Sequence, residues 1–148
     1  MSNHHRILVV ANETVEGNVL VEAVRDMALS QNADVLVVCP ALNTRLRHWM
    51  SDSDAARRAA EARLVACLER LDRAHVHARG WIGDADPLAA IDDALRLYSA
   101  DEIVIATHPE KRSNWLAHDL VGRARERFDQ PVLHVVVDVV RHEEYVAA

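Results

Sequence analysis

The stretch Glu102-Ile103-Val104-Ile105-Ala106-Thr107-His108-Pro109 indicates the fold of this chain. Its apolar, mostly β-branched residues predict a strand from Glu102 to Ala106 that is buried on both faces, as in a parallel sheet. The polar tip Thr107-His108-Pro109 ends that strand. Apolar residues at helical spacing follow from Trp115 to Phe128, and another apolar run begins at Pro131. A strand, a helix and a second strand in this order predict a βαβ unit with parallel strands.

The same alternation extends toward the N-terminus and covers nearly the whole chain. Residues 41–50 show no clear periodicity and are predicted to form a loop, and a polar, loosely held tail is expected after Arg141. We therefore expect one α/β domain over residues 1–148, with its core at about 6–137 and helices on both faces of a parallel sheet. The predicted strands, with helices between them, are Arg6–Ala11, Asp34–Cys39 (closed by Pro40), His75–Ile82, Glu102–Ala106 and Pro131–Val140.

Two segments carry residues that start helices. Ser51-Asp52-Ser53-Asp54 supplies side-chain acceptors and negative charge, both of which stabilise the free amides of a first helical turn. Asp86-Pro87 places an N-cap acceptor before a residue that suits the first helical position. These signals predict the starts of the second and third helices.

The composition argues against several classes of function. Half of the residues are apolar, only 4% are aromatic, and the formal net charge of −6 argues against a nucleic-acid or anionic-membrane surface. The apolar runs are too short to span a bilayer and Met1–Arg6 has no signal-peptide core, so we expect a cytoplasmic protein. Cys39 and Cys67 lack metal-motif spacing and are predicted to be reduced core residues.

Open α/β sheets bind ligands outside the carboxyl ends of their strands, where the strand order reverses. If the first strand is central, this reversal falls between the first and fourth strands. The tips that follow these strands, and those of the two strands beside the first, then hold the candidate ligand-binding residues. These candidates are Asn12, Glu13, Thr14, Cys39, Gly83, Asp84, Thr107, His108, Arg112, Ser113 and Asn114.

The segment after the fourth strand is open to two interpretations. Arg112 has a guanidinium group that forms paired hydrogen bonds to phosphate or carboxylate, and Ser113 or Asn114 is expected to cap the following helix. The same residues also fit an ordinary capped helix with solvated charges. His108 fits either a ligand contact with acid–base capacity or a loop histidine bonded to backbone.

Two further groups near the expected site also have alternative explanations. Glu13 and Asp84 supply two carboxylates, which fit a magnesium ion or acid–base chemistry, or simply a solvated pair of loop residues. Trp49 and Met50 lie in the unpatterned loop and are candidates for an apolar lid or a partner contact. No Walker loop, nucleophile elbow, kinase signature or zinc ligand set is present, so no catalytic or metal residue is assigned.

Several of these segments resemble the universal stress protein family. Ile7–Asn12, Asp101–Ile105 and Pro131–Val136 are similar to its first, fourth and fifth strands. Gly83 followed by Asp86–Ile91 is similar to its glycine and the start of its third helix. The resemblance implies a three-layer α/β fold of the adenine-nucleotide alpha-hydrolase-like type, with a five-stranded parallel sheet in the order 3-2-1-4-5. It also implies a homodimer.

The chain departs from this family's ATP-binding pattern. The resemblance aligns Asn12 with an aspartate of the ATP-binding members, and it aligns Ala106 and Pro109 with the first two glycines of a Gly-x-x-Gly loop. His118-Asp119 falls near the final Gly-Ser. Glycines let backbone amides approach phosphate closely, whereas proline has no amide hydrogen to donate. A negative charge about 5 Å from a phosphate costs roughly 3 kcal/mol at an effective dielectric constant of 20.

These observations lead to two functional hypotheses. The first is a non-enzymatic, dimeric stress-response, ligand-sensing or interaction protein that does not bind ATP in the usual family manner and that binds a small anion or no ligand. The alternative is a nucleotide-binding regulator or slow hydrolase that holds ATP or AMP with a remodelled phosphate loop. The apolar last strand, Val132–Val140, is the predicted dimer contact, because an open apolar edge pairs readily with another strand.

Overall fold

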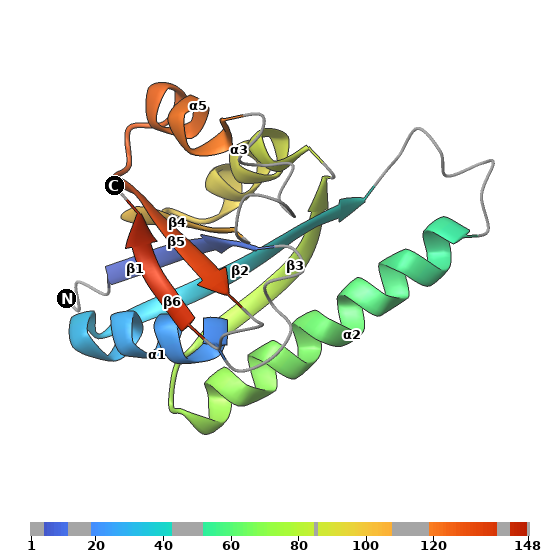
Figure 1. The fold of residues 1–148 in the computed structure, drawn as a ribbon, viewed down its shortest axis with the longest axis horizontal. Coiled ribbons are helices and arrows are strands. Elements are labelled where there is room, and N and C mark those ends of the chain that lie inside the picture. The colour runs from blue at the N-terminus through green and yellow to red at the C-terminus, as the bar shows by residue number, and fades with distance from the viewer. Residues whose placement is uncertain are drawn as a thin grey trace.

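The computed structural model describes residues 5–11, 19–42, 52–84, 86–107, 119–138 and 143–147. Strands and helices alternate along the chain up to the last two strands, which follow one another directly (Figure 1). The elements are β1 (His5–Val10), α1 (Val19–Gln31), β2 (Ala33–Leu42), α2 (Asp52–Arg73), β3 (Ala78–Asp84), α3 (Pro87–Leu97), β4 (Glu102–Thr107), α5 (Leu120–Arg127), β5 (Val132–Asp138) and β6 (Glu143–Ala147).

The described strands form one sheet in the order β3-β2-β1-β4-β5-β6. The first five strands in this order are parallel, which confirms the expected order 3-2-1-4-5. β1 is central, with Val10 opposite Val38 of β2 on one side and Ile105 of β4 on the other. The reversal of strand order therefore lies between β1 and β4, where the sequence placed it.

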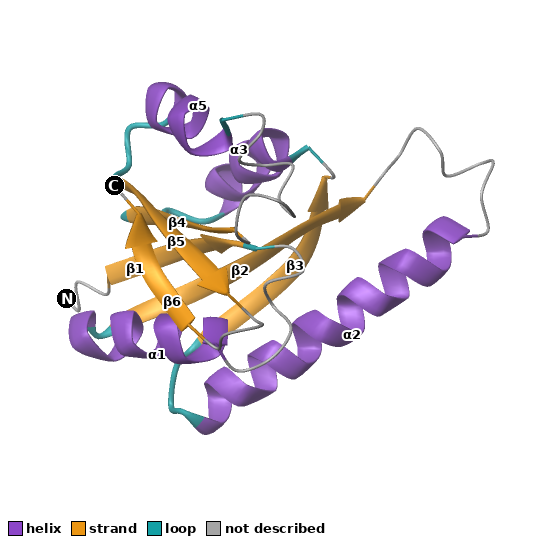
Figure 2. Ribbon diagram, viewed as in Figure 1, coloured by secondary structure: helices purple, strands orange, loops and turns teal. Residues whose placement is uncertain are grey.

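The chain end differs from the prediction. Residues 143–147 do not form a loosely held tail but the strand β6, which pairs antiparallel with β5 through contacts such as Val136 with Tyr145. The outer edge of β5 is therefore covered within the same chain (Figure 2). The described part of β5 therefore has no open edge, contrary to the premise of the predicted dimer contact at Val132–Val140, and the dimer itself stays a prediction. Val139 and Val140 lie outside the described residues.

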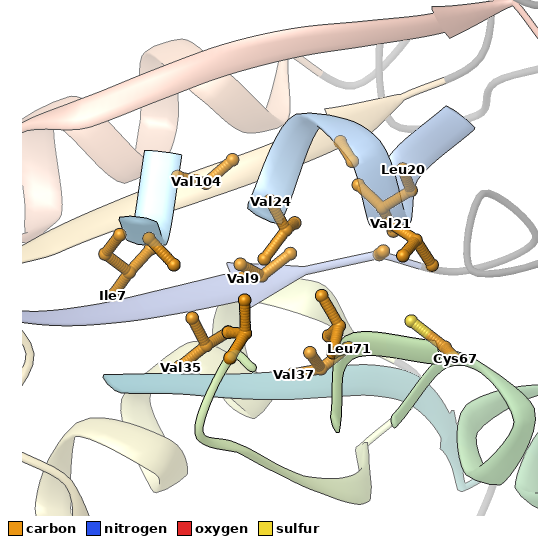
Figure 3. Packing of buried hydrophobic residues seen from close by; sticks show 14 of the residues in the cluster. Ile7, Val9, Leu20, Val21, Val24, Val35, Val37, Cys67, Leu71 and Val104 are labelled. Atoms are coloured by element: carbon orange, nitrogen blue, oxygen red, sulfur yellow. The ribbon is translucent and has the colours of Figure 1, made fainter. Parts of the chain in front are cut away.

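Two hydrophobic cores fill the space between the sheet and the helices. α1 and α2 cover one face and α3 and α5 cover the other (Figures 1 and 2). Alternate residues of each strand point to opposite faces, so Ile7 and Val9 pack toward α1 and α2, while Leu8 and Val10 pack toward α3. Figure 3 shows the first core, in which Leu71 of α2 approaches the strand residues. This double cover explains why the strands are almost continuously apolar.

Two boundaries differ from the prediction for local physical reasons. β2 continues through Pro40 to Leu42 beside β3. The Ala11 amide still donates to Val38 O, but Pro40 has no amide hydrogen to donate in return, which ends the pairing of β2 with β1. The register to β3 shifts between Pro40 and Leu42. β3 begins at Ala78 rather than His75, because His75 has a left-handed φ of 64° and the amide of Val76 donates to Leu71 O in closing α2.

None of the helices within the described ranges is long and apolar enough to cross a membrane.

Candidate ligand site at the carboxyl edge of the sheet

The carboxyl edge of the sheet is the edge at which β1, β2, β3 and β4 end, near Ala11, Cys39, Gly83 and Thr107. Cys39, Gly83, Asp84 and Thr107 are the predicted site residues that the structure describes, and all of them lie at this edge. Trp49, Met50 and Trp115 lie outside the described residues. The other site predictions that lie outside them are Asn12, Glu13, Thr14, His108, Arg112, Ser113 and Asn114.

Thr107, the last residue of β4, makes the most buried polar contact at this edge. Its Oγ1 lies 2.7 Å from Nε2 of His134 on β5, and the two residues are 2% and 7% exposed. Both side chains point to the face that α3 and α5 cover, because they share the alternation of Ile103 and Ile105. The Thr107 hydroxyl is therefore engaged inside the protein.

Burial makes His134 a weakly basic group. It lowers the pKa of the imidazole below its usual value, and the positive charge of Arg125 on α5 lowers it further. His134 is thus neutral near pH 7, and its Nε2 forms one hydrogen bond with the Thr107 hydroxyl. The sequence did not single out His134, because only the register of β4 and β5 brings residues 27 positions apart together.

Gly83 and Asp84 set the position of α3. A Cβ at Gly83 would lie 3.1 Å from Ala90 Cβ and 3.1 Å from Val38 Cγ1, so the glycine permits close packing of strand and helix. The Asp84 carboxylate accepts the Asp86 amide at 2.8 Å. Asp86 in turn accepts the Leu88 amide and caps α3, with Pro87 at the first position, as predicted. These two predicted ligand residues are therefore used in shaping the turn.

Cys39 and Cys67 are both buried, as the sequence predicted. Burial raises the pKa of the Cys67 thiol to about 11, and it also raises that of Cys39, where the nearby Arg63 opposes it. Neither thiol therefore has thiolate character near pH 7. Cys39 is therefore an uncharged, buried side chain at this edge.

Arg63 on α2 is a residue that sequence reasoning missed. Its Nε is buried and has no hydrogen-bond partner among the residues that the structure describes. Its charge acts on Cys39, near the carboxyl end of β2. A buried guanidinium nitrogen without an acceptor is costly. In the sequence Arg63 was one of several arginines in a mixed-charge helix, so no local signal separated it from solvated residues.

The start of α5 also differs from the prediction. It begins at Leu120, with Asp119 as its N-cap in the left-handed region at φ of 50°, and the predicted caps Ser113 and Asn114 lie outside the described residues. The Asp119 carboxylate accepts the Gly122 amide at 3.3 Å. The amide end of this helix thus already has an anionic partner.

The described part of this edge holds one buried hydroxyl–imidazole pair, Thr107 with His134, and one cation, Arg63. Among the described ranges no group of three or more His, Cys, Asp or Glu side chains is placed to hold a metal ion. The Asp84 carboxylate accepts the Asp86 amide, and Glu13 lies outside the described residues, so a magnesium or acid–base site formed by the two carboxylates stays a prediction. The described groups therefore fit binding of an anion better than a proton-transfer site that is open to a substrate.

Comparison with known proteins gives a fold but no sequence relative. No family model and no curated protein matches the chain. A universal stress protein family structure from Burkholderia pseudomallei matches with a TM-score of 0.62 at 20% identity, covering 90% of this chain and 97% of that one. A universal stress protein from Archaeoglobus fulgidus matches with a TM-score of 0.61 at 15% identity, covering 88% and 93%.

A universal stress protein family structure from Arabidopsis thaliana, with AMP bound, matches with a TM-score of 0.56 at 11% identity over 93% of this chain and 94% of that one. Other matching universal stress protein structures contain cAMP or dAMP. These likenesses confirm the fold that the resemblance implied. At such low identity they are similarities of architecture alone.

Proposed function

We propose that this chain is a universal stress protein-like ligand-sensing or interaction protein that binds a small anion at the carboxyl edge. The observation that carries the proposal is the buried Nε of Arg63 near Cys39, which has no hydrogen-bond partner within the described ranges. A guanidinium fork recognises phosphate or carboxylate, and this one stands at the edge where open α/β sheets bind ligands.

Several observations support the proposal that ATP is not held with the usual glycine loop. Ala106, which takes the first glycine position, is a buried core residue at the end of β4. The amide of Gly122 at the start of α5 is occupied by Asp119, whose negative charge opposes a phosphate there. Pro109, which lies outside the described residues, has no amide hydrogen to offer.

The alternative is an adenine-nucleotide regulator or slow hydrolase with a remodelled phosphate loop. It is favoured by one observation, namely that structures of the same fold contain AMP, cAMP or dAMP. In this alternative the Arg63 guanidinium binds the phosphates in place of some backbone amides of the glycine loop. Tight binding that requires the adenine ring would support it, whereas inorganic phosphate binding equally well would support the simpler anion site.

The test is thermal unfolding of the full chain with inorganic phosphate, AMP and Mg-ATP, each titrated separately. At a hundredfold excess over Kd a ligand stabilises the native state by about 2.7 kcal/mol, which for this size raises Tm by roughly 5–10 °C. Arg63→Met is expected to abolish most of this rise. Arg73→Met, at the exposed end of the same helix, is the matched control and should behave like wild type. Equal rises in all three proteins would contradict the role of Arg63.

We also propose that the protein is a homodimer, with the contact moved from β5 to the outer edge of β6. In the described sheet β6 is the last strand beyond β5, so its outward backbone groups are available for pairing. Sedimentation at micromolar concentration tests this, and a single monomeric species would contradict it.

A further inference from the structure

A separate cavity opens at the opposite edge of the sheet, where β2 and β3 begin. Its volume is about 190 Å³, and it is lined by Asp34, Val35, His77, Arg79 and Tyr98. Val35 pairs with Ala78 at the first rungs of β2 and β3, so the length of the strands separates this cavity from the carboxyl edge. Its volume equals roughly six waters at about 30 Å³ each, which suits a small metabolite rather than a nucleotide.

Two oppositely charged side chains, Asp34 and Arg79, face this cavity but do not form an ion pair with each other. Asp34 and Arg79 point to the same face of the sheet, because Arg79 lies opposite Leu36, two residues beyond Asp34. This diagonal offset keeps them apart, and neither forms an ion pair within the described residues. His77, whose carbonyl accepts the Val35 amide, also lines the cavity and adds a hydrogen-bonding ring.

Tyr98 forms the fixed wall of the cavity. It is 6% exposed, and its hydroxyl donates to the backbone carbonyl of Asp34 at 3.1 Å. Burial, and secondarily the charge of Asp34, raises the pKa of the phenol to about 12, so it stays neutral. The guanidinium groups of Arg6 and Arg79 each lie 5.9 Å from the ring centre. The aromatic face thus holds Arg79 in place over the cavity.

We propose that this cavity binds a small zwitterion, with a carboxylate on Arg79 and a protonated amine on Asp34, of about the size of an amino acid. A ligand with both charges bridges the two groups that the strand register holds apart. An anion alone would be opposed by Asp34 and a cation alone by Arg79, so each single-charge ligand forgoes one favourable contact and meets one repulsion. The Tyr98 ring leaves an apolar surface for a short side chain.

The experiment is an NMR titration of the uniformly labelled full chain with L-alanine, and in parallel with acetate and with methylammonium at the same ionic strength. We expect L-alanine to shift the amide signals of Val35, Ala78 and Tyr98 in a saturable way. Acetate and methylammonium should each bind at least tenfold more weakly, because each satisfies only one of the two charges.

Two variants connect the binding to the named charges. Arg79→Met keeps the aliphatic stem and Asp34→Asn keeps the backbone carbonyl that Tyr98 uses, and each should weaken L-alanine binding at least tenfold. Arg96→Met, on the surface of α3, is the matched control and should bind like wild type. Absence of saturable shifts in the wild-type protein overturns the site, and equal binding of acetate and L-alanine overturns the zwitterion. Because both results come from wild-type protein, a variant that fails to fold does not affect them.

Discussion

Thr107→Val tests whether the Thr107 hydroxyl belongs to the protein interior rather than to a ligand. Valine has nearly the shape of threonine, so the change removes the hydroxyl that lies 2.7 Å from His134 Nε2 and leaves little cavity. The imidazole nitrogen is then buried without a partner, which costs about 1–3 kcal/mol. For a chain of 148 residues this lowers Tm by roughly 3–10 °C.

A double-mutant cycle isolates the pair from the rest of the fold. Urea unfolding followed by circular dichroism is measured for wild type, Thr107→Val, His134→Leu and the double variant. We expect a coupling free energy of about 1–2 kcal/mol, because the second substitution removes the orphaned group that the first one leaves. Thr107→Ser keeps the hydroxyl and should retain the coupling. A Thr107→Val variant as stable as wild type, with no coupling, would refute the assignment.

Three further predictions concern stability. Burial lowers the folded-state pKa of His134, so the unfolded chain binds a proton at this residue more readily. The contribution of His134 to the free energy of unfolding should be full above pH 6.5 and be lost as pH falls through the folded-state pKa. A His134→Leu variant whose unfolding free energy has the same pH slope as wild type between pH 7 and 5 would contradict this. Leu71→Ala, at a residue that is 0% exposed, should lower the free energy of unfolding by about 2–5 kcal/mol, whereas Leu97→Ala, at a residue that is 79% exposed, should change it by no more than about 0.5 kcal/mol. Similar denaturation midpoints for the two variants would contradict this. Gly83→Ala should destabilise by about 1–3 kcal/mol through its contact with Ala90, and an unchanged Tm would show that α3 moves away freely.

The parallel part of the fold could be predicted because its local signals agree. Each inner strand is an apolar run, and α3 carries its own start signal in Asp86-Pro87. β6 could not be predicted in this way. Its segment begins with Glu143 and Glu144, and the preceding residues contain none of the glycine, asparagine or proline residues that mark a hairpin. Pairing with β5 and contact with α1, both distant in sequence, organise it.

The position of the candidate residues in the sheet was predictable, whereas the contacts that they make were not. The strand order placed the candidates at the carboxyl edge, but Gly83 and Asp84 proved to shape the turn into α3, and Thr107 is engaged by His134. Arg63 could not be identified because its importance depends on a buried atom without a partner, which is a property of packing rather than of spacing. Residues that cooperate across separate elements are visible only once the register is known.

The most direct test of the central claim is mass spectrometry of the small molecules released on denaturing gently purified wild-type protein and Arg63→Met. The account predicts a small anion other than ATP, near one per chain in the wild type and depleted in Arg63→Met. Near-stoichiometric ATP in both proteins would contradict it, because the phosphates would then be held without Arg63. An empty wild-type protein would contradict the anion site as well.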